Sequence, residues 1–354
     1  MKKIILTGGG TAGHVTPNIA LIPELKKRGY EIHYIGSKTG IEKQLIEEDK
    51  SIKYYGISSG KLRRYFDVKN FTDPFRVLKG FQEAKAIIKD IKPDVVFSKG
   101  GFVTVPVVIA ADKCKVPCII HESDMTPGLA NKICIPHAVK VCTNFPEAAN
   151  GIGHDKAVVT GTPIRKEMFS GNKIAGLDFL GFTANKPVLM VVGGSLGAAA
   201  INVLIRDALP DLLTKYQVVH LCGKGKVDES LKDVEGYRQF EYIKKEMADL
   251  MAAADLIVSR AGANAICEIL ALNKPNLLIP LPAASSRGDQ ELNAESFERQ
   301  GFSRVTKEEE LTTSRLIEEI DALYAERDTY IQKMKENSQA DSISIITNLI
   351  DQYA

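Results

Sequence analysis

The sequence predicts an α/β protein built from two doubly wound domains. Short apolar runs rich in β-branched residues alternate with amphipathic stretches of helical period from the first residue onward. This alternation stops near residue 160 and begins again near residue 188. A length of 354 residues also exceeds the usual size of one domain. Because strands that alternate with helices form parallel sheets covered on both faces, we expect two such sheets in tandem.

The first series of strands predicts an N-terminal domain over residues 1–163. Helix-like segments separate most of its strands, which is typical of strand–helix–strand units. The runs of strand length and composition are residues 4–6, 31–35, 94–98, 118–121 and 139–143.

The second series predicts a C-terminal domain over residues 164–339. Gly161, Thr162 and Pro163 break the periodicity before it, so we place the boundary there. A final helical segment, about residues 340–354, is expected to pack back on the first domain. Helical stretches at residues 201–208 and 247–254 separate strands of the second series. Those strands are residues 188–192, 217–221, 256–259 and 276–279.

Composition excludes several classes of protein. The 46 Lys and Arg residues nearly balance the 44 Asp and Glu residues, so a net charge of +2 gives no reason to expect nucleic acid as a partner. The six cysteines form no Cys-x-x-Cys pair, which favours reduced, buried thiols over a metal site. The sequence holds no apolar run of 18 residues and no signal-peptide core. We expect a folded protein that is neither exported nor membrane-spanning and that binds no metal.

A glycine-rich turn follows the first strand. Gly8, Gly10 and Gly13 match the Gly-x-Gly-x-x-Gly spacing that lets a backbone approach a diphosphate at a helix N-terminus. A dinucleotide site would also need an acidic residue after the second strand, which here ends in Gly36 and Ser37. The turn therefore predicts a phosphate site but not an NAD site, unless it serves only to pack the helix on the strand.

A second glycine turn, Gly193 to Ala198, follows the first strand of the second series. We expect it to face the first turn across a cleft, each presenting backbone N–H groups and a positive helix end. Ser195 would add a hydroxyl to a phosphate oxygen, although a serine at this place is also an ordinary helix N-cap.

Two further segments carry candidate ligands of a nucleotide sugar. Glu268 lies in an apolar helix that starts near Gly262. There its carboxylate would accept hydrogen bonds from a ribose diol, or would pair with Arg260 or a backbone donor. Asp289 and Gln290 open another helix, either to bond sugar hydroxyls or as caps. Arg165, just past the domain boundary, would bind a diphosphate or remain solvated.

Taken in order, these motifs resemble the MurG family of bacterial N-acetylglucosaminyltransferases, over nearly the whole chain. The segments that carry the resemblance are Gly8 to His14, Ser98 to Gly101, His121-Glu122, Pro127 to Asn131, Gly161 to Arg165, Gly193 to Ala198, Arg260 to Ala263 with Glu268, and Gln290 with Asn293.

The resemblance implies a GT-B fold of two Rossmann-like domains facing across a cleft, without metal or other cofactor. It implies that the C-terminal domain binds UDP-N-acetylglucosamine and the N-terminal domain an undecaprenyl-linked muramoyl-peptide. The implied product is lipid II of peptidoglycan synthesis, made from lipid I. The substrate-binding residues that it implies are Thr11, Ala12, Gly13, Asp124, Arg165, Ser195, Ile243, Ala263, Asn264, Ala265, Ile266, Cys267, Glu268 and Gln290.

The resemblance also implies roles for these residues. Thr11 to Gly13 approach the sugar and diphosphate, and Arg165 and Ser195 meet the diphosphate or nucleoside. Ile243 and Ala263 to Cys267 wall the uracil, Glu268 takes the ribose, and Gln290 reads the sugar. The chain departs from the family pattern at Ser123-Asp124, where many members have Gln-Asn, and at Asp289, where they have His or Gln.

The implied reaction is an inverting attack of the muramic acid 4-hydroxyl on the anomeric carbon. His14 is suited to take the proton because an unperturbed imidazole titrates near pH 6.5, and Glu122 is the competing base. Glycine-turn N–H groups, a helix N-terminus and Arg165 would stabilise the departing UDP.

The stretch between Lys61 and Phe81 carries cations interleaved with aromatic and aliphatic residues. Six basic and two acidic side chains between residues 61 and 80 give a local charge of about +4. Such a face either rests on anionic headgroups or is a solvated face over a core stripe. With a polyprenyl-linked acceptor, we expect a peripheral protein on the cytoplasmic face of the plasma membrane.

Other classes of function remain open from the residues alone. A lipid glycosyltransferase or a UDP-N-acetylglucosamine epimerase would share the fold and the UDP-sugar site. A nucleotide-binding oxidoreductase is disfavoured by the missing acidic residue after the second strand. A non-catalytic nucleotide-sugar sensor would bind without turnover.

Overall fold

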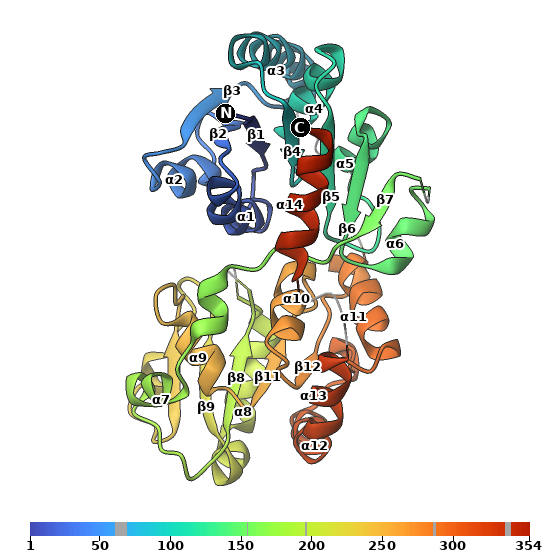
Figure 1. Cartoon of the computed structure of the whole chain (residues 1–354). Helices are drawn as coiled ribbons and strands as arrows, with labels where there is room; N and C mark the ends of the chain where they lie inside the picture. Colours follow the sequence, from blue (N-terminus) through green and yellow to red (C-terminus); the bar gives the residue numbers. More distant parts are fainter. Residues whose placement is uncertain (61–68, 154, 195–196, 286–287, 337–340) are drawn as a thin grey trace. The chain divides into compact units, whose positions relative to one another are not determined.

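The computed structural model describes residues 1–60, 69–153, 155–194, 197–285, 288–336 and 341–354, with side chains described from residue 75 in the second range and to residue 284 in the fourth. The chain forms two compact units (Figure 1). Unit 1 comprises Met1–Arg165 and Asp341–Ala354, and unit 2 comprises Lys166–Ala340. The predicted fold class is confirmed, because each unit holds a parallel sheet flanked by helices.

Unit 1 contains a seven-stranded sheet in the order β3-β2-β1-β4-β5-β6-β7. All its strand pairs are parallel, with Ile5 of β1 level with His33 of β2 and Val96 of β4. The strands are β1 (Lys3–Thr7), β2 (Glu31–Ser37), β3 (Lys53–Ile57), β4 (Val95–Ser98), β5 (Cys118–Glu122), β6 (Lys140–Thr143) and β7 (Ala157–Val159).

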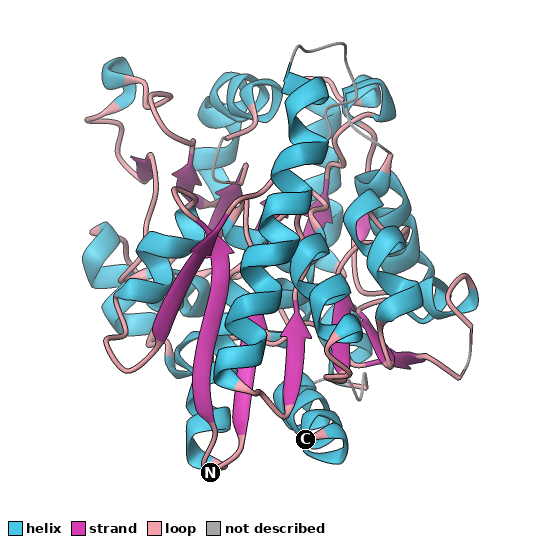
Figure 2. Cartoon of the chain, turned by 90° about the horizontal axis from the view of Figure 1, so that it is seen from above, coloured by secondary structure: helices cyan, strands magenta, loops and turns pink. Residues whose placement is uncertain are grey.

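Helices cover both faces of this sheet, as the cyan coils beside magenta strands show (Figure 2). The α-helices of unit 1 are α1 (Thr16–Lys27), α2 (Ile41–Glu47), α3 (Lys69–Ile91), α4 (Thr104–Lys113), α5 (Leu129–Cys134), α6 (Pro146–Asn150) and α14 (Ser342–Tyr353), with short 3₁₀ helices η1 (Ala12–His14) and η2 (Ile135–His137). The carboxyl ends of the strands are left to the loops, which is where parallel sheets carry ligand sites.

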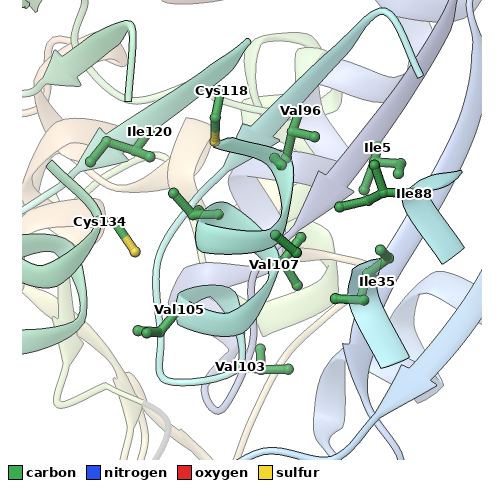
Figure 3. Close-up of a cluster of buried hydrophobic side chains, with 14 of the residues drawn as sticks. Ile5, Ile35, Ile88, Val96, Val103, Val105, Val107, Cys118, Ile120 and Cys134 are labelled. Atoms are coloured by element: carbon green, nitrogen blue, oxygen red, sulfur yellow. The ribbon is translucent and has the colours of Figure 1, made fainter. Parts of the chain in front are cut away.

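The core of unit 1 follows from the two-residue period of its strands. Ile5 and Val96 point to the face covered by α3 and α4, where they meet Ile88 and Val107 (Figure 3). Their neighbours Ile4, Leu6 and Phe97 point to the opposite face, against α1 and α14. Successive side chains of a strand point to opposite faces, so a strand covered on both sides is apolar throughout.

The last helix, α14, belongs to unit 1 although it is far from it in sequence. It packs against α1 and β4, and Ile346 and Ile350 are fully buried in the core there. Arg28 and Tyr30 each donate a hydrogen bond of 2.6 Å to Asp351. The red helix beside β4 and β5 in Figure 1 is this segment.

Unit 2 contains a six-stranded sheet in the order β10-β9-β8-β11-β12-β13, again with parallel pairs. Its strands are β8 (Val188–Val192), β9 (Gln217–Leu221), β10 (Tyr237–Phe240), β11 (Leu256–Ser259), β12 (Asn276–Leu278) and β13 (Arg304–Val305). Its α-helices are α7 (Lys173–Leu180), α8 (Ala199–Lys215), α9 (Met247–Ala253), α10 (Ala263–Ala271), α11 (Asp289–Arg299), α12 (Thr313–Ala325) and α13 (Arg327–Lys335); its 3₁₀ helices are η3 (Lys166–Ser170), η4 (Glu229–Leu231), η5 (Ala283–Ser285) and η6 (Glu308–Glu310).

Within the described residues, no helix has both the length and the apolar character that crossing a membrane requires.

Candidate functional site

The first glycine turn lies at the carboxyl end of β1, an inner strand of the unit 1 sheet. Its backbone is held from two sides, because the Tyr34 hydroxyl donates to the Gly8 carbonyl at 2.7 Å and Gly9 N–H donates to the Gly100 carbonyl at 3.3 Å. Gly10 has a φ of +87°, which residues other than glycine rarely adopt. These contacts and the φ of Gly10 hold the backbone of the turn in place.

His14 closes this turn, at the end of η1. Its Nδ1 lies 3.1 Å from the Gly9 carbonyl oxygen and 3.1 Å from Thr11 Oγ1. A carbonyl oxygen only accepts, so Nδ1 carries the proton and donates it to Gly9. In the neutral ring Nε2 then holds the lone pair, and the hydrogen bond at Nδ1 makes Nε2 the basic atom.

The three residues before His14 form the surface of the turn. Thr11 is exposed with an extended backbone, while Ala12 and Gly13 are half-buried in η1. The Ala12 carbonyl accepts hydrogen bonds from Thr16 Oγ1 and from Val15 N–H, which join the turn to the start of α1. Four of the predicted residues, Thr11 to His14, which are consecutive in the chain, thus lie just before the N-terminus of α1.

Glu122 is buried at the end of β5, where it accepts hydrogen bonds from the loop that follows. Its Oε1 accepts from Asp124 N–H at 3.0 Å, and its Oε2 accepts from Gly128 N–H at 3.0 Å and Asn131 Nδ2 at 2.9 Å. Asp124 is half-buried in the same loop. Both carboxylate oxygens of Glu122 thus bind protein donors, an arrangement typical of a structural carboxylate.

A buried cation lies next to the glycine turn, and sequence reasoning gave it no role. Lys99 follows β4, is 1% exposed, and donates from Nζ to Ser123 Oγ and, at 3.0 Å, to His121 Nδ1. His121 Nε2 donates to the Gly161 carbonyl at 2.9 Å. Burial, and then the charge of Lys99, hold the pKa of His121 well below its usual value, so this imidazole is neutral.

A buried carboxylate, Glu42, lies on the other side of the turn and was also missed. The sequence indicated no acidic residue at the end of β2, but Glu42 comes five positions after Ser37, in the first turn of α2. Its oxygens accept from Ser37 N–H at 2.9 Å and from Gly10 N–H at 3.2 Å. Because these bonds are to the protein's own backbone, Glu42 differs from the ribose-binding acid of an NAD site.

The second glycine turn follows β8 in unit 2. Gly197 has a φ of +67°, and a side chain there would lie 1.9 Å from the Cys222 carbonyl oxygen, so the turn packs directly on the loop after β9. Lys226 Nζ donates to the Gly197 carbonyl at 3.3 Å. Ser195 lies outside the described residues.

Helix α10 carries the predicted nucleoside residues on two faces. Ala263, Ile266 and Cys267 are buried, whereas Asn264, Ala265 and Glu268 are half-buried. Asn264 and Glu268 are four positions apart and share a face.

The contacts of Arg260 concern the alternative in which Arg260 pairs with Glu268. Its guanidinium donates to Glu308 and, at 3.1 Å each, to the carbonyls of Ile279 and Pro280. These contacts fix the Arg260 head group toward η6 and the end of β12.

Helix α11 joins the neighbouring loop to α10. Asn293 Nδ2 donates to the Ala261 carbonyl at 3.2 Å, and Gln290 Oε1 accepts from Leu281 N–H at 3.0 Å. Asp289 is buried at the helix start, and Ile243 is buried after β10. The structure thus groups Gln290 with the α10 residues at the carboxyl edge of β11 and β12. Arg165 is half-buried and is the last residue of the segment Met1–Arg165 of unit 1.

Two doubly wound parallel sheets, each with a glycine turn after its first strand, form the GT-B fold. Together with the family matches that follow, they assign the chain to the nucleotide-sugar glycosyltransferases of this fold. Residues 4–143 match the glycosyltransferase family 28 N-terminal domain and residues 188–349 match the glycosyltransferase family 28 C-terminal domain. The latter match extends into α14, which packs with unit 1.

The chain is 64% identical, over 352 residues and 99% of both chains, to the UDP-N-acetylglucosamine--N-acetylmuramyl-(pentapeptide) pyrophosphoryl-undecaprenol N-acetylglucosamine transferase of Lachnoclostridium phytofermentans. Identity to the protein of the same name from Clostridium botulinum strain Hall is 59% over 353 residues, covering 100% of this chain and 99% of that one. The chain therefore belongs to this family of N-acetylglucosamine transferases, the MurG family.

Solved structures agree with this fold. The crystal structure of Acinetobacter baumannii MurG superimposes with a TM-score of 0.79 at 27% identity, over 99% of this chain and 100% of that chain. A UDP-N-acetylglucosamine 2-epimerase from Neisseria meningitidis gives a TM-score of 0.71 at 15% identity, over 99% and 100% of the two chains, and shares the fold alone.

Proposed function

We propose that this chain transfers N-acetylglucosamine from UDP-N-acetylglucosamine to the undecaprenyl-linked muramoyl-peptide, lipid I, giving lipid II. The observation that carries the proposal is the 64% identity over 99% of both chains to a transferase named for this donor and acceptor. The chain is thus a hexosyltransferase of cell-wall synthesis.

For the chemical step, we propose that His14 Nε2 is the general base. The 4-hydroxyl proton of the muramic acid passes to Nε2 while its oxygen forms a bond to the anomeric carbon of the donor. The bond from that carbon to the β-phosphate oxygen breaks, and its electron pair leaves with UDP, so the configuration inverts. The hydrogen bond from Nδ1 to the Gly9 carbonyl supports this role, because it leaves the lone pair on Nε2.

Glu122 is the weaker candidate for the base. Its two oxygens accept three hydrogen bonds from the loop and helix that follow β5. A carboxylate engaged in this way holds backbone in place, so we propose that Glu122 shapes the loop that carries Asp124.

For the donor, we propose that unit 2 binds the nucleoside. Glu268 would accept both ribose hydroxyls, buried Ile243 and residues 263–267 would wall the uracil, and Gln290 would bond the sugar. Asn264 lies on the same half-buried face of α10 as Glu268, which supports a polar contact there.

For the leaving diphosphate, we propose that backbone N–H groups and cations replace a metal. In unit 1 the first glycine turn, the start of α1 and Arg165 would donate to its oxygens. No group of three or more His, Cys, Asp or Glu suited to a metal occurs among the residues that the structure describes.

For location, we propose that α3 rests on the cytoplasmic membrane surface. Phe75 and Leu78 are 76% and 57% exposed, with exposed Arg76 and Lys79 beside them. Apolar side chains flanked by cations suit an anionic headgroup layer. Lys61, Arg63 and Arg64 of the same predicted patch lie outside the described residues.

The test is a transfer assay with radiolabelled UDP-N-acetylglucosamine and a short-chain lipid I analogue, with chelator present. We expect label in a lipid II analogue at an undiminished rate with chelator. Formation of UDP-N-acetylmannosamine without acceptor would instead indicate an epimerase. Binding of UDP without transfer would contradict the proposed activity.

A further inference from the structure

The peptide unit that joins Gly9 to Gly10 has a charged group at one end and the candidate base at the other. Its N–H, that of Gly10, donates to Glu42 Oε2 at 3.2 Å. Its carbonyl, that of Gly9, accepts from His14 Nδ1 at 3.1 Å. One planar amide thus lies between a carboxylate and an imidazole.

Three glycines surround this carboxylate: Gly9 of the glycine turn, Gly36 of β2 and Gly40 before α2. A Cβ on Gly9 or Gly40 would lie 2.6 Å and 2.4 Å from the Glu42 carboxyl carbon, and a Cβ on Gly36 would lie 2.8 Å from Glu42 Cγ. Because all three positions are glycines, the Glu42 carboxyl group occupies the space that their side chains would take, and Glu42 is itself 0% exposed.

The remaining contacts of Glu42 hold it in that place. Ser37 donates to Glu42 Oε1 through its N–H, at 2.9 Å, and through its hydroxyl, at 2.5 Å. Tyr54 donates from its hydroxyl to the Ser37 carbonyl at 2.5 Å, which fixes the Ser37 backbone. The carboxylate is therefore anchored on the β2 side and points its second oxygen at Gly10.

We propose that Glu42 is a positioning residue for His14 and acts through the Gly9–Gly10 peptide. By accepting from Gly10 N–H, the carboxylate orients this amide and polarises it, which makes the Gly9 carbonyl a better acceptor for His14 Nδ1–H. Glu42 thus acts like the carboxylate that orients a catalytic histidine in other enzymes, except that one amide lies between Glu42 and His14. The inference rests on the proposed function in that it takes His14 as the base.

The first test is Glu42→Gln, which keeps the side-chain volume. It replaces one accepting oxygen with an NH₂ group, which faces either Gly10 N–H or Ser37 N–H. We expect kcat to fall about 10- to 100-fold, the usual cost of removing a group that orients a functional histidine, while KM for UDP-N-acetylglucosamine changes little. Glu47→Gln, on an exposed glutamate of the same helix, is the control and should leave kcat unchanged.

The second test is a double-mutant cycle with His14→Ala. If Glu42 acts through His14, Glu42→Gln should add no further loss of kcat in the His14→Ala background. A full further loss would show that Glu42 only holds the turn, and would overturn the inference while leaving His14 as the base. Activity of His14→Ala near wild type would instead overturn the proposed base.

A third measurement reads the imidazole itself by ¹⁵N NMR of the histidine-labelled protein. We expect His14 of the wild type to carry its proton on Nδ1 at neutral pH, and the Nε2–H form to gain population in Glu42→Gln. Wild-type His14 with its proton on Nε2 would overturn the inference even if the variant failed to fold. An unchanged tautomer in a folded Glu42→Gln would overturn it as well.

Discussion

The chemistry of His14 depends on contacts that no motif displays. Its place after a glycine turn could be predicted from the sequence, because the turn spacing and the helix start are local features. Its tautomer could not, because the Gly9 carbonyl that fixes it is oriented by the fold of the turn. Glu42 and Lys99 were missed for a related reason. Each side chain follows one strand and forms a hydrogen bond with a residue in or after the neighbouring strand, and only the sheet brings the two strands together.

At the residue scale, Glu268 offers the sharpest test of the nucleoside site. We expect Glu268→Ala to weaken UDP binding by about 1–3 kcal/mol, because hydrogen bonds between hydroxyls and a carboxylate would be lost. Isothermal titration with UDP measures the effect, with circular dichroism to verify the fold. Glu310→Ala, at an exposed glutamate of the same unit, is the matched control. Equal UDP affinity in Glu268→Ala and wild type would remove Glu268 from the ribose site.

At the scale of elements, the missed strands have one property in common. The inner strands of both sheets were predicted because, buried on both faces, they are continuous apolar runs. The four that were not predicted are the edge strands β3, β7, β10 and β13. β10, Tyr237-Arg238-Gln239-Phe240, carries polar residues as a loop does, and β3 is interrupted by Gly56. β7 and β13 have only three and two residues, too few for a pattern to appear.

The exposed face of α3 leads to a prediction on membrane binding. Replacing Phe75 and Leu78 by Ser and Arg76 and Lys79 by Ala should reduce co-sedimentation with vesicles that contain anionic lipid. Turnover on a soluble acceptor analogue should stay within about twofold, because the field of these charges decays over about 8 Å at physiological salt. Lys224→Ala with Lys232→Ala, two exposed cations of unit 2, is the control. Unchanged co-sedimentation would leave α3 as an ordinary solvated helix.

Helix α14 leads to a second prediction at this scale. Ile350 is fully buried against unit 1, so Ile350→Ala should destabilise that unit by about 2–5 kcal/mol through lost burial and a cavity. Thermal unfolding measures this as a lower transition temperature, and UDP affinity, a property assigned to unit 2, should not change. Gln352→Ala, an exposed neighbour, should shift stability by no more than about 0.5 kcal/mol. Equal loss in both variants would contradict the packing of α14.

At the scale of the whole molecule, both units hold a buried histidine in the neutral state. His121 of unit 1 lies between Lys99 and the Gly161 carbonyl. His220 of unit 2 lies between Tyr237 and Asn202, at 2.9 Å from each. Burial, reinforced by the charge of Arg206, lowers the pKa of His220 to about 3. Neither residue is an obvious core position in the sequence, since only the fold supplies the partners that satisfy a buried imidazole.

These two histidines predict how stability depends on pH. A group whose folded pKa is depressed binds its proton more readily in the unfolded chain, so stability is lost as pH falls below the unfolded value of about 6.5. For His220 the loss should reach about 1 kcal/mol at pH 5.5, and His121 should act in the same direction in unit 1. The transition temperatures of both units should therefore fall between pH 7.5 and pH 5.5. His220→Gln removes the titrating group from unit 2, so its transition should depend less on pH than that of the wild type, even if the variant is less stable at pH 7.5. An equal pH dependence in His220→Gln and wild type would mean that His220 titrates normally in the folded protein.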